Sequence, residues 1–229
     1  MGQDLSEGQA FLDNEQFNLA IKFFSRILET QPTNIEALNG IAKAKRLSGD
    51  SMSALKSYQK SISINPNQPD TWISVGNIQY NQKFFQEAEF SYQNAVKLDP
   101  KNPLAHNNLA IVLKEQENLD GAIFHFEKAF VFDSTYGLAC RNLGDVYLRL
   151  KQGNKAKNWL KIAIEVDPGN LYGHYWLGKA YYQLKEFDKA RDQFLHVLTN
   201  KPNLHTVHHD LGLAYFGMRN YGPAINHIK

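Results

Sequence analysis

The sequence is poor in cysteine: Cys140 is the only one among 229 residues. A single cysteine cannot form an internal disulfide or a metal site built from several cysteines, which fits a reducing compartment such as the cytoplasm. The formal net charge is only +2, which is too small to indicate a nucleic acid or an anionic membrane surface as partner. No apolar run reaches the roughly 18 residues that a membrane-spanning helix needs.

Targeting signals are also missing at the N-terminus. The segment MGQDLSEGQAF lacks the basic start and the apolar stretch of a secretory signal, although a signal removed before residue 1 would leave no trace. The residues Gly2 and Ser6 do match the pattern for N-myristoylation. We favour the simpler interpretation, that the segment leads into an ordinary helix, and we expect a cytoplasmic protein.

What the sequence does contain is a period of 34 residues. Prolines recur at this spacing with one gap, at Ser134, and alanines recur without a gap. The prolines are Pro32, Pro66, Pro100, Pro168 and Pro202, and the alanines are Ala20, Ala54, Ala88, Ala122, Ala156, Ala190 and Ala224. The repeats are therefore 1–34, 35–68, 69–102, 103–136, 137–170, 171–204 and a partial 205–229. No linker interrupts them, so we expect one domain over residues 1–229.

Each repeat has the pattern of two helices. In the fifth repeat, Leu143, Val146 and Tyr147 follow a helical period, not the alternation of a strand. Pairs such as Gly49-Asp50 and Gly153-Asn154 indicate a turn between the halves. The proline ends the second helix because it cannot continue the hydrogen-bond ladder. Three asparagines two residues after a proline are placed to cap the next helix, namely Asn34, Asn102 and Asn170.

Small residues at the eighth place of each repeat allow the two helices to approach closely. They are Gly8, Ala42, Gly76, Ala110, Gly144, Gly178 and Gly212. One hairpin cannot bury its apolar faces alone, so each repeat needs its neighbours.

This pattern resembles the tetratricopeptide repeat over essentially the whole chain. The third repeat carries it in the residues Trp72, Val75, Gly76, Ala88, Tyr92, Ala95 and Pro100. The second repeat departs most, with Lys45 at the usual aromatic place and Ser61 at the usual alanine. The resemblance implies an all-α fold, a right-handed α-solenoid superhelix of helix-turn-helix repeats. It also implies that the first helices line a concave groove in which partner proteins or peptides bind.

Catalytic motifs are missing: no phosphate-binding glycine loop, paired CxxC motif or nucleophile elbow is present. We therefore expect no enzyme activity and no cofactor. His205 and His209 lie four residues apart and could share a metal, but they lack an obvious third ligand. His208 occupies the fourth place of its repeat, as do His106 and His174, so it is interpreted as a scaffold residue and no metal site is predicted.

Two sets of residues are candidates for the groove. Asparagine amides both donate and accept hydrogen bonds, so a ladder of them could pair with an extended peptide backbone, although asparagine on a helix face can also be merely solvated. The sixth repeat instead places aromatic side chains there, a residue type that dominates interface hot spots, although some of these rings must pack on the next repeat. The full set of predicted partner-binding residues is Asn77, Asn107, Asn108, Ile111, Arg141, Asn142, Asp145, Tyr172, Tyr175, Trp176, Lys179, Tyr182 and His209.

A clamp for C-terminal carboxylates, found in co-chaperones of the family, is not carried over. Asn77 and Asn108 match its asparagines, but Ile73, Leu138 and Asn142 stand where it needs basic residues.

The leading hypothesis is a scaffold that binds an extended segment of a partner protein in the groove. One alternative is self-association through an uncapped C-terminal end, where Ala224, Ile225 and Ile228 are expected to lie uncovered because the period breaks off at Lys229. The other is the substrate-recruiting arm of a longer enzyme, such as a glycosyltransferase, of which this sequence would be a fragment.

Overall fold

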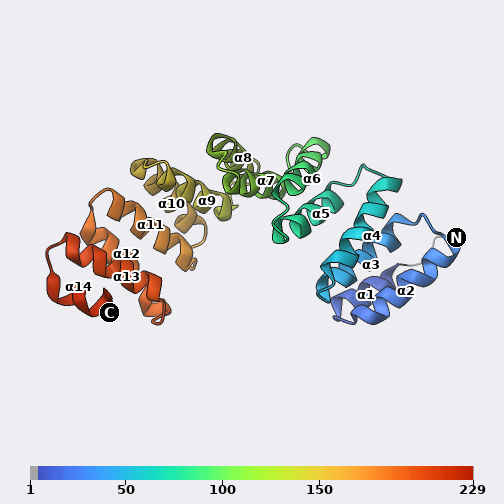
Figure 1. Cartoon of the computed structure of the whole chain (residues 1–229), viewed down its shortest axis with the longest axis horizontal. Coiled ribbons are helices and arrows are strands. Elements are labelled where there is room, and N and C mark those ends of the chain that lie inside the picture. The colour runs from blue at the N-terminus through green and yellow to red at the C-terminus, as the bar shows by residue number, and fades with distance from the viewer. Residues whose placement is uncertain (1–4, 229) are drawn as a thin grey trace. The chain divides into compact units, whose positions relative to one another are not determined.

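The computed structural model describes residues 5–228, so Gly2 and its myristoylation pattern lie outside the described residues. Within this range the chain forms fourteen α-helices and no strand, and they follow one another as the first and second helices of successive repeats (Figure 1). The helices are α1 (Ser6–Asp13), α2 (Phe17–Thr30), α3 (Ile35–Leu47), α4 (Ser51–Ile64), α5 (Pro69–Asn81), α6 (Phe85–Leu98), α7 (Pro103–Glu115), α8 (Leu119–Phe132), α9 (Gly137–Arg149), α10 (Gly153–Val166), α11 (Leu171–Gln183), α12 (Phe187–Asn200), α13 (His205–Gly217) and α14 (Tyr221–Ile228).

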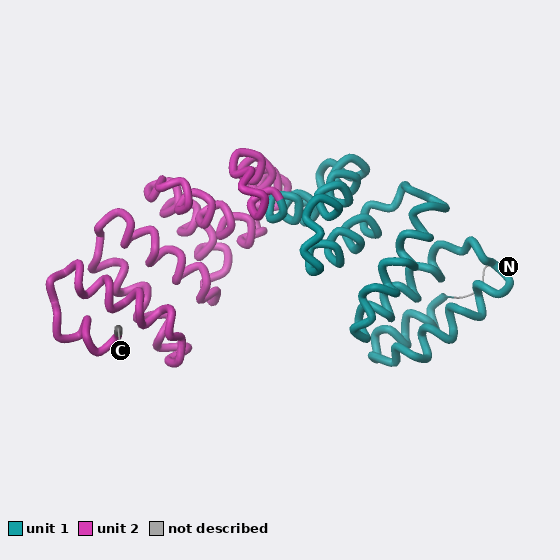
Figure 2. The backbone as a smooth tube through the Cα atoms, in the orientation of Figure 1, with its two compact units in different colours: residues 1–112 teal, residues 113–229 magenta. Residues whose placement is uncertain are grey.

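The chain divides into two compact units, residues 1–112 and 113–229 (Figure 2). In the first unit each helix from α1 to α6 packs on the next. In the second unit the same holds from α8 to α14, and the first helices α9, α11 and α13 also contact one another in order. The expectation of one domain over the whole chain stays a prediction. Among the described residues, no helix combines the length and the apolarity needed to cross a bilayer.

The helix boundaries confirm the predicted period and the all-α repeat fold. From α3 at Ile35 onward, every first helix begins at the first place of its repeat. The predicted caps are present: the Asn34 side chain accepts from the backbone N–H of Ala37 at 2.9 Å. Asn102 caps α7 and Asn170 caps α11 in the same way. These bonds satisfy N–H groups that a helix start leaves without an intrahelical partner.

The turn between the two helices of a repeat differs from the prediction at Gly153-Asn154. These two residues begin α10, and the turn residue is Lys151, with φ of 59°. The prediction at Gly49 is right, since its φ is 95°. A residue with positive φ recurs at the fifteenth place of each repeat, and six of the seven are not glycine: Glu15, Lys83, Glu117, Lys151, Lys185 and Arg219. Glycine was therefore a poor guide to the turn.

Substitution at these turns should change stability in opposite directions. At positive φ, a residue with a Cβ is less stable than glycine by roughly 1–2 kcal/mol. Part of this difference is cancelled because glycine loses more chain entropy on folding. We expect Lys151→Gly to raise the free energy of unfolding by about 0.5–1 kcal/mol and Gly49→Ala to lower it by a similar amount. Urea denaturation of both variants measures this, and shifts of the same sign would contradict it.

The glycines at the eighth place are in contact with the second helix of the same repeat. A Cβ added to Gly144 would lie 2.4 Å from Cγ of Leu160, and one added to Gly178 would lie 2.6 Å from a ring carbon of Phe194. Leu160 and Phe194 are fully buried. The close approach predicted from the sequence is therefore confirmed, and it requires the missing Cβ.

A ring N–H at the fourth place ties four of the repeats to the loop before them. Nε1 of Trp72 donates to the carbonyl oxygen of Pro66 at 2.9 Å. The same contact joins His106 to Pro100 at 3.1 Å, His174 to Pro168 at 3.4 Å, and His208 to Pro202 at 2.7 Å. This explains why histidine recurs at that place of the scaffold.

Cys140 holds the same place in the fifth repeat, and the loop before that repeat has Ser134 in place of the recurring proline. Its thiol is buried, and burial raises the pKa of Cys140 to about 12. A thiol that stays protonated is a poor nucleophile, so Cys140 is a packing residue.

Candidate protein-binding surface

The predicted asparagines of the first unit bond to one another. Oδ1 of Asn77 accepts from the hydroxyl of Tyr92 at 2.7 Å and from Nδ2 of Asn108 at 3.0 Å. Oδ1 of Asn108 accepts from Nδ2 of Asn107 at 3.2 Å, and Asn107 is only 1% exposed. These amides hold α5 to α6 and α7. Asn107 is not on the accessible surface, and Asn77 and Asn108 already use groups that a peptide backbone would need.

The other predicted asparagine, Asn142, belongs to the second unit and is also buried. Its Oδ1 accepts from Nη2 of Arg141 at 3.2 Å. Burial removes Asn107 and Asn142 from the set of residues that can touch a partner directly. Ile111 is half-buried on α7, and its contact with a partner stays a prediction.

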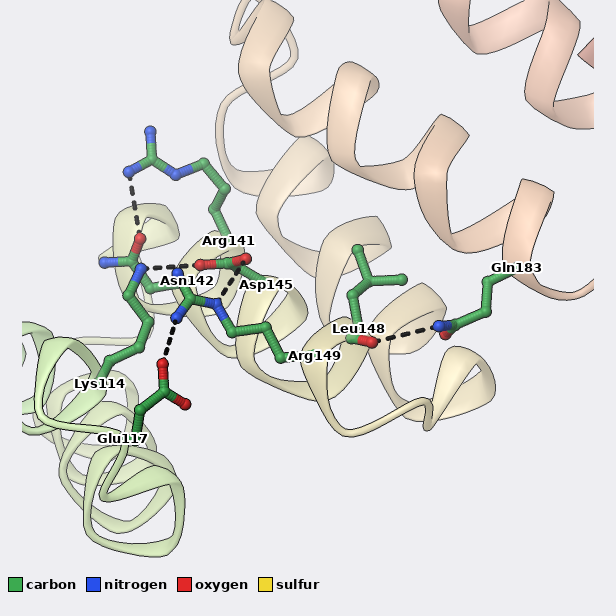
Figure 3. A network of polar contacts seen from close by, with 8 residues as sticks. All are labelled: Lys114, Glu117, Arg141, Asn142, Asp145, Leu148, Arg149 and Gln183. Atoms are coloured by element: carbon green, nitrogen blue, oxygen red, sulfur yellow. Dashed lines mark hydrogen bonds and ion pairs between the residues drawn. The ribbon is translucent and has the colours of Figure 1, made fainter. Parts of the chain in front are cut away.

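Asp145 is part of a polar network that joins α7 to α9 (Figure 3). Its carboxylate accepts from Nζ of Lys114 at 2.7 Å and lies 3.6 Å from Nε of Arg149. Arg149 also reaches Glu117 at 3.6 Å. Lys114 and Asp145 side chains are both 12% exposed. The predicted groove residue Asp145 therefore connects two repeats and leaves little of its charge accessible to a partner.

The aromatic residues of α11 divide into a fixed and an exposed set. The Tyr175 hydroxyl donates to Oδ2 of Asp210 on α13 at 2.9 Å, and Nζ of Lys179 lies 3.4 Å from the same oxygen. Burial, and then the bond to Asp210, raises the pKa of Tyr175, so the hydroxyl stays a donor. The ring of Tyr175 packs edge-on to Trp176 with centroids 5.4 Å apart.

The exposed set carries the larger accessible area. Tyr172 is 62% exposed and Tyr182 is 36% exposed on α11, and Phe216 on α13 is 60% exposed. His209 is also exposed, with Nδ1 3.6 Å from Oδ1 of Asp210. We call the residues Tyr172, Tyr175, Trp176, Lys179, Tyr182, His209, Asp210 and Phe216 the aromatic face. Asp210 was missed as a site residue, although its sixth place in the repeat could have indicated it.

A pocket of about 220 Å³ opens beside this face, between α11 and α13. Tyr172 and Tyr175 form part of its wall. Its lining is Leu171, Tyr172, Tyr175, Val197, Lys201, Leu204, Thr206 and Val207. Val197, Lys201 and Leu204 could not be predicted from the repeat pattern, because they come from the second helix and the following loop and reach the pocket only through packing.

The first unit has a hollow of about 340 Å³ along its own first helices. Its lining includes Glu36 and Lys43 of α3 and Asp70 of α5. Asn39 also lines it: its Nδ2 donates to Gln68 at 2.8 Å, while its buried Oδ1 has no hydrogen-bond partner. The predicted partner-binding residues lie in repeats 3 to 7, and none of them lines this hollow in repeats 1 to 3.

Two histidines near the C-terminus are in contact with each other. Nδ1 of His208 lies 3.0 Å from Nδ1 of His227 on α14. Because Nε2 of His208 must donate to the Pro202 carbonyl, neutral His208 accepts at Nδ1 and His227 donates.

His205 and His209, which the sequence places four residues apart, are not joined by a third metal ligand. Among residues 5–228, no three His, Cys, Asp or Glu side chains could hold a metal ion together.

Acidification should weaken the packing of α14. Burial, and then His208, lowers the pKa of His227 from the ordinary 6.5. The folded chain therefore binds this proton less tightly than the unfolded chain, so the stabilisation is complete above pH 6.5 and is lost as the pH falls below it. We expect a loss of about 1 kcal/mol, the net contribution of one hydrogen bond.

Hydrogen exchange of the α14 amides, corrected for intrinsic rates, measures this effect. His227→Phe should remove the pH dependence between about pH 7.5 and 5.5, where histidine titrates. His205→Gln, at an exposed position outside the pair, should keep it. Equal pH dependence in all three proteins would contradict the assignment.

At the C-terminal end, one expectation is wrong. Ala224 was expected to lie uncovered, but it is only 2% exposed because α14 packs on α13. Ile225, in contrast, is exposed as expected. The side chain of Ile228 lies outside the described residues.

Comparison with known families decides the nature of the repeats. The family described as "TPR repeat" matches residues 85–117 and 144–185, and two families described as "Tetratricopeptide repeat" match residues 171–204 and 35–68. These matches together cover more than half of the chain. The chain belongs to the tetratricopeptide repeat family. In this tetratricopeptide repeat protein the aromatic face lies on first helices, which agrees with the place expected from the sequence.

Solved structures of other tetratricopeptide repeat proteins are similar to it. MamA is 25% identical, with 71% of this chain and 95% of MamA covered and a TM-score of 0.66. YrrB, a TPR protein with an unusual peptide-binding site, is 22% identical, with 76% and 89% covered and a TM-score of 0.65. The pilF protein of Pseudomonas aeruginosa is 16% identical, with 94% of each chain covered and a TM-score of 0.76. No curated protein matches the sequence.

Proposed function

We propose that the protein is an interaction scaffold that binds an extended segment of a partner protein along its first helices. The observation that carries this proposal is the accessible aromatic surface of α11 and α13, where Tyr172 and Phe216 are each more than half exposed. Large rings left in water lose the stabilisation that burial would give, and their exposure on one face marks an interaction site. The peptide-binding site of the similar protein YrrB supports the proposal.

The contacts of the second unit favour a rigid surface. Asp210 of the seventh repeat accepts a hydrogen bond from Tyr175 of the sixth repeat, and Lys179 forms an ion pair with the same carboxylate. Side chains held before binding lose little conformational entropy when a partner arrives. If the chain is the substrate-recruiting arm of a longer enzyme, the same face would bind the substrate protein.

Affinity purification from cells that express the protein tests the proposal. The variant Tyr172→Ala/Tyr182→Ala removes two exposed rings from first helices. The control Phe90→Ala/Phe124→Ala removes two exposed rings from second helices. If each interfacial tyrosine contributes about 2 kcal/mol, the first variant binds several hundredfold more weakly.

We expect at least one protein to be retained by the wild type and the control and lost with the first-helix variant. Equal retention by all three proteins would contradict binding along the first helices.

Self-association is a second candidate, supported by the exposed side chains of Tyr221 and Ile225 on α14. Sedimentation velocity over a range of concentrations tests it. We expect Ile225→Lys to abolish any dimer, and a wild-type protein that stays monomeric at every concentration would exclude it.

A further inference from the structure

The pocket between α11 and α13 has the size of one side chain. Its volume of about 220 Å³ exceeds the roughly 150 Å³ of a cavity that holds benzene. It is smaller than the roughly 300–1,000 Å³ of sites that enclose a small-molecule ligand. The buried residues Val197 and Val207 contribute apolar surface to it. A pocket of this kind fits a phenylalanine or leucine side chain.

The wall of the pocket is fixed before any partner binds. The Tyr175 ring lies 6.1 Å from that of Phe194, and its hydroxyl is held by Asp210. Tyr172, by contrast, forms an exposed rim. An apolar side chain entering here would cover the accessible face of Tyr172 without rearranging Tyr175.

A guanidinium lies beside the ring of Tyr172. Cζ of Arg141, on α9, is 6.0 Å from the centroid of the Tyr172 ring, whereas no residue of α9 lines the pocket. Arg141 is half-buried, and no carboxylate of the described residues lies within 4.0 Å of it. Burial lowers the pKa of Arg141, but an arginine keeps its charge in proteins.

The other charges at the pocket favour an acidic ligand. Lys201 lines the pocket and, like Arg141, forms no ion pair with a described carboxylate. Lys179 differs, because it pairs with Asp210, whose carboxylate also holds Tyr175. Two basic groups that form no ion pair with a described carboxylate therefore stand beside Tyr172. Asp145, whose charge acts on Arg141, is already paired with Lys114.

We infer that the bound segment places one large apolar side chain in this pocket and an acidic side chain, two residues away, on Arg141. This inference rests on the proposed function and names the chemistry of the segment. In an extended peptide, residues i and i+2 point to the same side and lie about 7 Å apart. With one side chain in the pocket beside Tyr172, the side chain two residues away points the same way and can reach Arg141, whose guanidinium is 6.0 Å from the Tyr172 ring. The carboxylate is assigned to an internal aspartate or glutamate, since the clamp for a C-terminal carboxylate is absent.

Selection from a random library of short peptides displayed on phage, with the full chain as bait, tests the inference. Peptides enriched on the wild type should share a Phe or Leu two residues from an Asp or Glu. Arg141→Gln should remove the acidic preference and weaken binding of such a peptide about tenfold or more, as expected for a charge-assisted hydrogen bond. Thr206→Trp, at an exposed position of the lining, should remove the apolar preference and keep the acidic one.

The control is Lys161→Gln, which makes the same change of charge at an exposed position of α10 and should leave the enriched motif unchanged. Enriched peptides without the acidic and apolar pair, or with an essential free C-terminus, would overturn the inference while leaving the proposed function standing. No enrichment on any variant, or an enrichment that Tyr172→Ala/Tyr182→Ala does not alter, would instead count against the proposed function itself.

Discussion

Replacing Phe194 with alanine is expected to lower the free energy of unfolding by about 3–5 kcal/mol, the usual cost of truncating a buried phenylalanine. Phe194 is fully buried and its ring lies against Gly178 of the preceding helix. The truncation therefore removes the contact between α11 and α12 and leaves a cavity that a glycine opposite cannot fill. Chemical denaturation measures the change. Leu195→Ala, at the exposed neighbouring position, should cost less than about 1 kcal/mol.

The same contact predicts a coupling between the two positions. A Cβ at Gly178 would meet the ring of Phe194 at 2.6 Å, so Gly178→Ala should cost about 1–3 kcal/mol through overpacking. With Phe194→Leu in the same chain, the added methyl gains room, and the double variant should be more stable than the sum of the two single changes predicts. Strict additivity would contradict a direct packing contact.

Replacing Asp145 with asparagine is expected to lower the free energy of unfolding by about 3 kcal/mol, the lower end of the range for a broken buried ion pair. The lower end applies because both side chains of the Lys114–Asp145 pair keep some contact with water. Without the carboxylate, Lys114 is left charged and poorly solvated at 2.7 Å from an amide (Figure 3). Thermal and chemical denaturation measure the loss.

The matched control removes both charges. Lys114→Met/Asp145→Leu leaves no uncompensated charge, and such a replacement is often neutral in other proteins. We expect the double variant to be more stable than Asp145→Asn. A double variant that is less stable than the single one would show that the network has a role beyond pairing these two charges.

The repeat period could be predicted from the sequence because it depends on local rules. The prolines that recur every 34 residues lie just after a second helix, asparagine caps the helix that follows, and glycine at the eighth place marks where a ring or a leucine approaches. The turn residue could not be found in this way. Its left-handed conformation is imposed by the geometry of the hairpin, which holds even Lys151 and Arg219 at positive φ.

The candidate site was predicted less well, for a physical reason. A place in the repeat shows which face of a helix a residue occupies, but not what the neighbouring repeat places opposite it. Asn107 and Asn142 hold places in the repeat that were expected to face the groove, and both are nevertheless buried. Asp145 is held by Lys114, one repeat away. The pocket at Tyr172 needs Lys201 and Leu204, whose positions depend on how two hairpins stack.

Photo-cross-linking in cells tests binding along the first helices most directly. A benzoylphenylalanine placed at Tyr182 of α11 lies on the aromatic face, and one placed at Phe124 of α8 lies on a second helix where the side chain is 53% exposed. We predict a cross-linked partner protein at Tyr182 and none at Phe124. A partner that cross-links at Phe124 and not at Tyr182 would contradict the account.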